Sequence, residues 1–136
     1  MIIVVSLLVV WKTNSQERRE ELNKKLNQQE KLTLECINQS NQHMDEFKYV
    51  TVKLKETEIE VDCPRLVRIQ EEYDVLSDRC QEILKDYEIL VQESREVYAK
   101  GEADLSTQRA IKAQENFLAN REFIDDKVTK CLQKSL

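Results

Sequence analysis

The sequence contains one glycine and one proline among 136 residues, which limits the chain to long elements joined by few tight turns. Charged residues make up 35% of it and aromatic residues only 6%. The commonest residues include Leu, Ile, Glu, Lys and Gln, a set dominated by helix formers. Because aromatic side chains are scarce, apolar surface is best buried in thin seams between helices. The sequence therefore predicts a mainly all-α protein, an antiparallel helical bundle or coiled coil of about three helices.

The N-terminal end differs sharply from this charged body. A run of ten residues, apolar except for Ser6, ends in the interfacial pair Trp11 and Lys12. As a helix the run rises about 15 Å, half of a hydrocarbon core of about 30 Å. We expect residues 1–12 to be a short membrane helix, or one whose first residues lie upstream, and residues 13–136 to form the helical domain. The residues assigned to the anchor are Ile2, Ile3, Val4, Val5, Leu7, Leu8, Val9, Val10 and Trp11.

Two other interpretations of this run stay open. It is short enough to be a buried core element, since an apolar run of this length has no diagnostic period. It is also a candidate signal sequence, although no basic region precedes it and no small-residue cleavage site follows it.

The spacing of apolar residues and the helix-breaking residues divide the rest of the chain into three expected helices, at residues 15–47, 64–100 and 104–134. The stripe of the first is Leu22, Leu26, Leu34, Ile37, Met44 and Phe47. Pro64 suits the first turn of the second helix, and Gly101 suits a left-handed residue just after its end. Asp104 or Ser106 is the expected cap of the third helix.

The second helix carries the most regular pattern. Apolar residues recur there at alternating steps of three and four, which is typical of one face of a coiled coil or bundle. We assign these residues as an interaction seam: Leu66, Ile69, Tyr73, Leu76, Ile83, Tyr87, Leu90 and Val97, with Cys80 inside it.

Residues 49–62 are ambiguous. They alternate between apolar and polar side chains and are rich in β-branched residues, which favours a small β-hairpin. Phe47, Leu54 and Val61 also repeat every seven residues, which favours a helix. We expect the hairpin, with a helix as the alternative.

The four cysteines predict disulfides rather than a metal site. None forms a C-x-x-C pair, and the one histidine, His43, lies seven residues past Cys36. In antiparallel hairpins, residues equidistant from a turn face each other. Cys36 and Cys80 are symmetric about position 58, and Cys63 and Cys131 about position 97, both near expected turns. We therefore expect bridges Cys36–Cys80 and Cys63–Cys131, with other pairings or free thiols as alternatives.

Residues 56–96 hold five basic and thirteen acidic residues, a net charge of −8, which disfavours nucleic acid binding. A solvated helix face explains this charge. One glycine excludes phosphate-binding loops and nucleophile elbows. Neighbouring carboxylates such as Asp125 and Asp126 point to different helix faces. We expect no catalytic residue, metal, cofactor or small-molecule substrate.

The pattern favours a non-enzymatic, membrane-anchored interaction protein that binds a partner protein or itself. Lys12, Arg18 and Arg19 follow the apolar run, which by the positive-inside rule places the body in the cytoplasm. Disulfides instead require an oxidising compartment, so we expect a periplasmic or extracellular body. A cytoplasmic coiled-coil tether with reduced cysteines is the alternative. The chain is similar to inner-membrane spanins of phage lysis systems in its plan alone, which is a short anchor followed by a helical rod with cysteines.

Overall fold

A computed structural model describes the backbone of residues 2–56 and 63–134, and the side chains of 15–51 and 63–134. It contains three long helices, α1 (Ile2–Glu56), α2 (Cys63–Glu93) and α3 (Glu102–Lys134). A short 3₁₀ helix, η1 (Arg95–Val97), lies between α2 and α3. The expected helical bundle is confirmed, and the described residues contain no strand.

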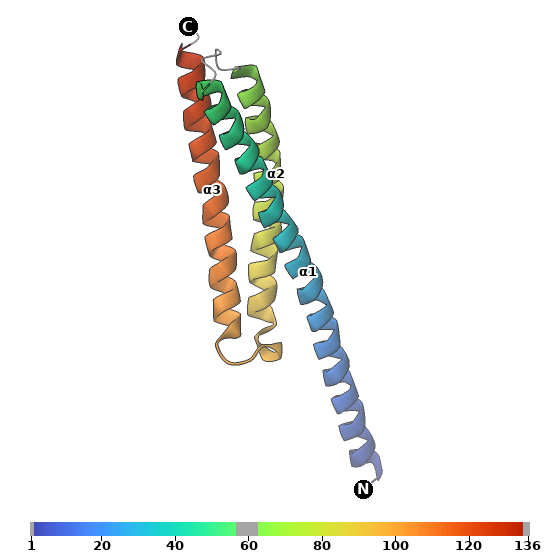
Figure 1. Cartoon of the computed structure of the whole chain (residues 1–136). Coiled ribbons are helices and arrows are strands. Elements are labelled where there is room, and N and C mark those ends of the chain that lie inside the picture. Colours follow the sequence, from blue (N-terminus) through green and yellow to red (C-terminus); the bar gives the residue numbers. More distant parts are fainter. Residues whose placement is uncertain (1, 57–62, 135–136) are drawn as a thin grey trace.

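The helices form an elongated three-helix bundle in which α2 runs antiparallel to both neighbours (Figure 1). With 55 residues α1 is about 80 Å long, whereas α2 and α3 are each about 50 Å long. The N-terminal part of α1 therefore extends past the turn between α2 and α3, as Figure 1 shows.

The separate membrane helix expected at residues 1–12 is not found. The polar residues 13–15 do not interrupt α1, which runs continuously from Ile2. No helix in the described part of the chain has an apolar stretch long enough to cross a membrane. Among the described side chains of α1, which begin at residue 15, the first buried one is Leu26, and Arg18 pairs with Glu96 at 3.6 Å near the turn.

The β-hairpin expected at residues 49–62 is wrong over its first half, because α1 continues to Glu56. Met44, Phe47 and Val50 are buried at helical spacing on one face of α1, so the helical period prevails there. Residues 57–62 lie outside the described residues.

The core of α1 departs from the expected stripe, in which Leu22 and Ile37 are only half-buried. Leu34 is exposed, whereas Thr33 and Ser40 are buried beside Cys36. The buried face keeps its helical spacing by accepting these small polar side chains.

The expected seam of α2 is correct as far as Cys80 and then shifts by one residue. Leu66, Ile69, Tyr73, Leu76 and Cys80 are buried. Beyond them Tyr87 is also buried, but Leu84 and Val91 replace Ile83 and Leu90 as buried positions. A straight helix with 3.6 residues per turn drifts by about 20° per heptad, and an extra four-residue step restores contact with the core. Ile83, Leu90 and Val97 pack at the margin, half-buried.

Gly101 has a different role from the expected one. Because α2 ends at Glu93, Gly101 does not follow it directly but precedes α3, with a φ of +88°. Its carbonyl oxygen accepts the backbone N–H of Leu105 at 3.2 Å, the first turn of α3. Arg95 donates to Asp104 at 2.7 Å across this connection. The expected caps, Asp104 and Ser106, both lie inside α3.

The two expected disulfides are present. Cys36 and Cys80 join α1 to α2 with their Cα atoms 5.7 Å apart, and Cys63 and Cys131 join the start of α2 to the end of α3 at 5.9 Å. Both α1 and α3 are therefore covalently linked to α2.

Candidate functional site

The expected seam on α2 is used mostly inside the molecule. Five of its residues are buried against α1 and α3: Leu66, Ile69, Tyr73, Leu76 and Tyr87. A partner has no access to them while the bundle is folded. A hollow that a partner could enter lies elsewhere on the surface.

That surface is the line where α1 meets α3. On the α3 side of this line the buried lining residues are Ala110, Ala113 and Phe117, and the two alanines reach too little to close the gap. At the same height the bond from Cys36 to Cys80 holds α1 on α2. A groove remains between α1 and α3.

The groove consists of two hollows of about 370 Å³ and about 150 Å³ that share Ile37 and Arg109. The shared residues make them adjacent, and we call the two together the α1–α3 groove. Its apolar surface comes from Ile37, Leu34, Ala110, Ala113, Phe117 and Tyr87.

A buried polar contact between all three helices supports the larger hollow from beneath. The Tyr73 hydroxyl on α2 lies 2.8 Å from the Ser40 hydroxyl on α1 and accepts the Asn120 amide N–H at 3.1 Å. Ser40 and Asn120 also line the groove. Tyr73 is fully buried, and its ring lies 6.0 Å from that of Phe117. This contact fixes how the three helices are aligned along the axis of the bundle.

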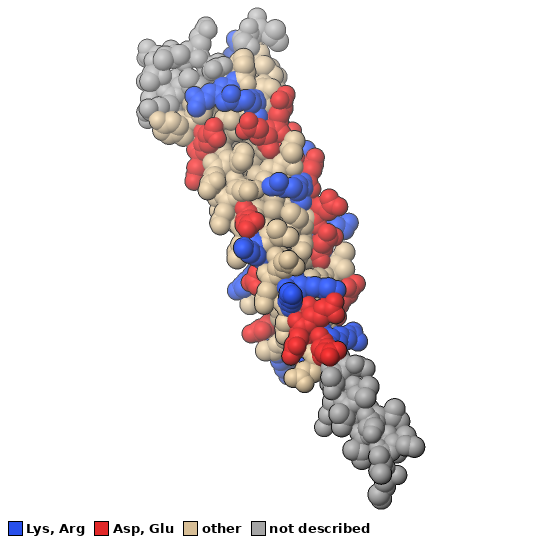
Figure 2. All heavy atoms as spheres, turned by 90° about the vertical axis from the view of Figure 1, so that its right-hand side faces the viewer, with Lys and Arg blue, Asp and Glu red and all other residues tan. Residues whose placement is uncertain are grey.

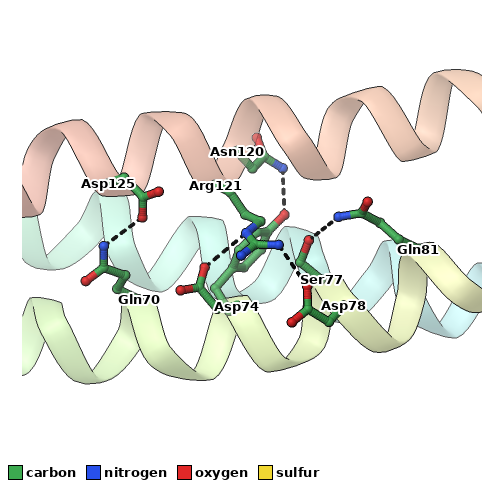
Figure 3. A network of polar contacts seen from close by, with 9 residues as sticks. Gln70, Asp74, Ser77, Asp78, Gln81, Asn120, Arg121 and Asp125 are labelled. Atoms are coloured by element: carbon green, nitrogen blue, oxygen red, sulfur yellow. Dashed lines mark hydrogen bonds and ion pairs between the residues drawn. The ribbon is translucent and has the colours of Figure 1, made fainter.

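Two cations at the groove have no carboxylate partner among the described residues. Arg109 and Lys112 are exposed, and neither forms an ion pair with a described residue. Arg121, one turn beyond Phe117, shows the contrast. Its guanidinium is held by Asp74 at 3.2 Å and by Asp78 at 2.8 Å (Figure 3).

The amides at the groove are also available. Asn41 and Asn116 line it, and their side-chain amides form no hydrogen bond with a described residue. Each amide offers both a donor and an acceptor. The one acidic residue among the lining residues is Glu30, at the end nearer the turn.

A separate hollow lies on another side of α1. About 260 Å³ lies between α1 and α2 beside Cys36, lined by Leu32, Ile83 and Arg79 among others. The Arg79 guanidinium already donates to Gln39 at 2.9 Å. Figure 2 shows acidic and basic side chains interspersed along a face of the rod, as expected for a solvated surface.

No protein-family model, curated protein or solved structure matches this chain.

The described residues contain no group of three or more metal-ligating side chains placed to hold an ion. His43 lies against the ring of Tyr73 at 6.3 Å, and its Nδ1 is 2.9 Å from the Gln39 carbonyl oxygen. Burial, and then the neighbouring Tyr87, raise the pKa of Tyr98 far above its ordinary value. Its proton is therefore held throughout the neutral range.

Sequence reasoning missed the groove because it assigned the contact surface to the most regular stripe. A signal was present, since Arg109 and Lys112 flank the small residues Ala110 and Ala113 on α3. Small residues at core spacing allow close packing, and only the position of α1 decides whether it occurs.

Proposed function

We propose that this is a non-enzymatic helical interaction protein, moored to a membrane by the N-terminal end of α1, whose cross-linked bundle binds a partner protein. The observation that carries the proposal is the place of the apolar run. Ile2 to Trp11 form the far end of α1, which extends beyond the turn between α2 and α3 (Figure 1).

Helical geometry supports a shallow anchor. Ten helical residues rise about 15 Å and so reach about one leaflet of a bilayer. Trp11 ends this run and Lys12 follows it, at the position where interfacial residues are enriched. Because α1 is continuous, the anchored N-terminal end holds the bundle at a distance from the lipid surface.

The cysteine pairs support a body in an oxidising compartment. Both pairs join helices that lie far apart in sequence, with separations of 44 and 68 residues. Disulfides of this kind persist in periplasmic and extracellular proteins and are reduced in most cytosols.

Flotation with zwitterionic liposomes tests the anchor. We expect the full chain to float and the variant Val5→Asp/Leu8→Asp to stay at the bottom of the gradient. The matched control Val75→Asp/Ile89→Asp alters two exposed apolar residues of α2 and should float. Equal flotation of all three proteins, or of none, would remove the anchor from the proposal.

Alkylation of thiols in intact cells, before and after reduction, tests the compartment. We expect the four cysteines to react only after reduction. Four reactive thiols before reduction would favour the cytoplasmic tether instead.

A further inference from the structure

The shape of the α1–α3 groove matches an extended ligand better than a compact one. Its lining residues on α3 run from Ser106 to Asn120, a distance of about 21 Å along the helix. Two parallel helices form the walls along this length, since α1 and α3 run in the same direction (Figure 1). A third rod of similar length fits between such walls.

The groove also has the chemical pattern of a helix-binding site. Ile37, Ala113 and Phe117 give an apolar floor, and Leu34 stands on the α1 wall with 55% of its surface exposed. Such a floor receives the apolar face of an amphipathic helix, with anchors at every third or fourth residue. The rim amides of Asn41 and Asn116 are placed for hydrogen bonds to polar residues beside those anchors.

Charge selects among such helices. Arg109 and Lys112 are exposed and unpaired among the described residues, whereas Glu30 is the sole carboxylate of the lining and lies toward one end. The chain as a whole carries a net charge of −5. An acidic helix is therefore attracted at this groove and repelled by the strongly acidic segment 56–96, whose net charge is −8.

We propose that the α1–α3 groove binds an acidic amphipathic helix of a partner protein, which packs on Ile37, Ala113 and Phe117 and completes a four-helix bundle. The inference depends on the proposed function as an interaction protein and adds the chemistry of the partner. Carboxylates of that helix lie opposite Arg109 and Lys112.

A second copy of this chain is a poorer occupant. Its acidic helix is α2, whose outward large apolar residues are Val75 and Ile89. They are fourteen positions apart, which leaves about four turns without an apolar anchor for the floor.

Methyl NMR of the full chain in zwitterionic detergent tests the site. The probe is a synthetic helical peptide with leucines at every third or fourth position and glutamates beside them. The same peptide with lysines in place of the glutamates is the control ligand. Methyl groups of Ile37, Ala110 and Ala113 report on the groove, and those of Val75 and Ile89 report on the outer face of α2.

We expect the acidic peptide to shift the groove methyls and the basic peptide to leave them unchanged. Arg109→Glu/Lys112→Glu should weaken binding about tenfold or more, because it reverses both cations at the site. Arg68→Glu/Lys85→Glu makes the same charge change at exposed positions on α2 and should bind as the parent chain does.

Three results would overturn the inference. No shift at millimolar peptide would remove the helix site, and equal shifts with both peptides would remove the selection by charge. Light scattering that shows a dimer, lost in Arg109→Glu/Lys112→Glu, would assign the groove to a second copy. Loss of flotation with intact peptide binding would reject the anchor alone, so the two proposals fail separately.

Discussion

The hydroxyl of Tyr73 lies 2.8 Å from that of Ser40, and this buried contact connects α2 to α1 across 33 residues of sequence. Asn120 of α3 donates to the same Tyr73 oxygen at 3.1 Å. One phenol therefore satisfies polar groups from both neighbouring helices, directly beneath the groove.

We expect Tyr73→Phe to lower the free energy of unfolding by about 1–3 kcal/mol, because it leaves the Ser40 hydroxyl and the Asn120 amide without their partner. Urea unfolding measures the loss. The double variant Tyr73→Phe/Ser40→Ala should cost less than the sum of the single variants, since it removes both partners of one contact. Additive costs would show that the contact contributes nothing.

Each disulfide should stabilise the fold substantially. Loops of 44 and 68 residues correspond to about 4 kcal/mol each by chain entropy, and measured values are commonly about 2–4 kcal/mol. Cys36→Ser/Cys80→Ser and Cys63→Ser/Cys131→Ser should each lower the denaturation midpoint. Peptide mapping without reduction should recover the pairs Cys36–Cys80 and Cys63–Cys131, and any other pair would contradict the fold.

Gly101→Ala should destabilise the protein by about 1 kcal/mol through backbone strain alone. The φ of +88° disfavours residues with a Cβ atom, yet no atom lies within 4 Å of where that Cβ would stand. Gly101→Asn should cost less, because asparagine tolerates this region better. Thermal unfolding of the two variants separates strain from steric overlap. An alanine variant as stable as the parent would rule strain out.

Stability should fall as the pH rises above about 10. The folded chain keeps the Tyr98 proton because its pKa is raised, chiefly by burial, while the unfolded chain loses that proton near the ordinary tyrosine pKa of about 10. The unfolded state then binds fewer protons, so the free energy of unfolding declines with pH. Tyr98→Phe should make this decline shallower in urea titrations between pH 9 and 11. An unchanged slope would assign the decline to other groups.

Filling the groove should block binding without unfolding the bundle. Ala113→Leu adds three carbons beside a hollow of about 370 Å³, so we expect its stability to stay within about 1 kcal/mol of the parent. Ala103→Leu is the matched control, since Ala103 is buried as Ala113 is but lines neither hollow of the groove. Overpacking there should cost about 1–3 kcal/mol. Peptide titration and urea unfolding of both variants check the prediction.

The sequence determined the helical class, the number of long helices and the pairing of the cysteines. Near-absence of glycine and proline leaves few places for a turn, and Cys36, Cys80, Cys63 and Cys131 stand symmetrically about those places. Helix formation depends on local residues, and the cysteine pairing follows from antiparallel geometry, so the spacing of residues is sufficient to predict both.

The tertiary structure decided where the spacing was ambiguous. Residues 49–56 alternate like a strand, but burial of Phe47 and Val50 on one face of α1 makes them helical. The seam of α2 shifts from Ile83 to Leu84 because a 3.6-residue helix drifts from a strict heptad.

Only the tertiary structure revealed the groove. Small residues such as Ala110 and Ala113 allow helices to pack closely, and whether they do so depends on where α1 lies. The link from Cys36 to Cys80 holds α1 on α2, so the side of α3 that carries Arg109 and Lys112 stays open. A surface formed by two helices more than 60 residues apart has no period in the sequence, which is why the sequence alone does not contain it.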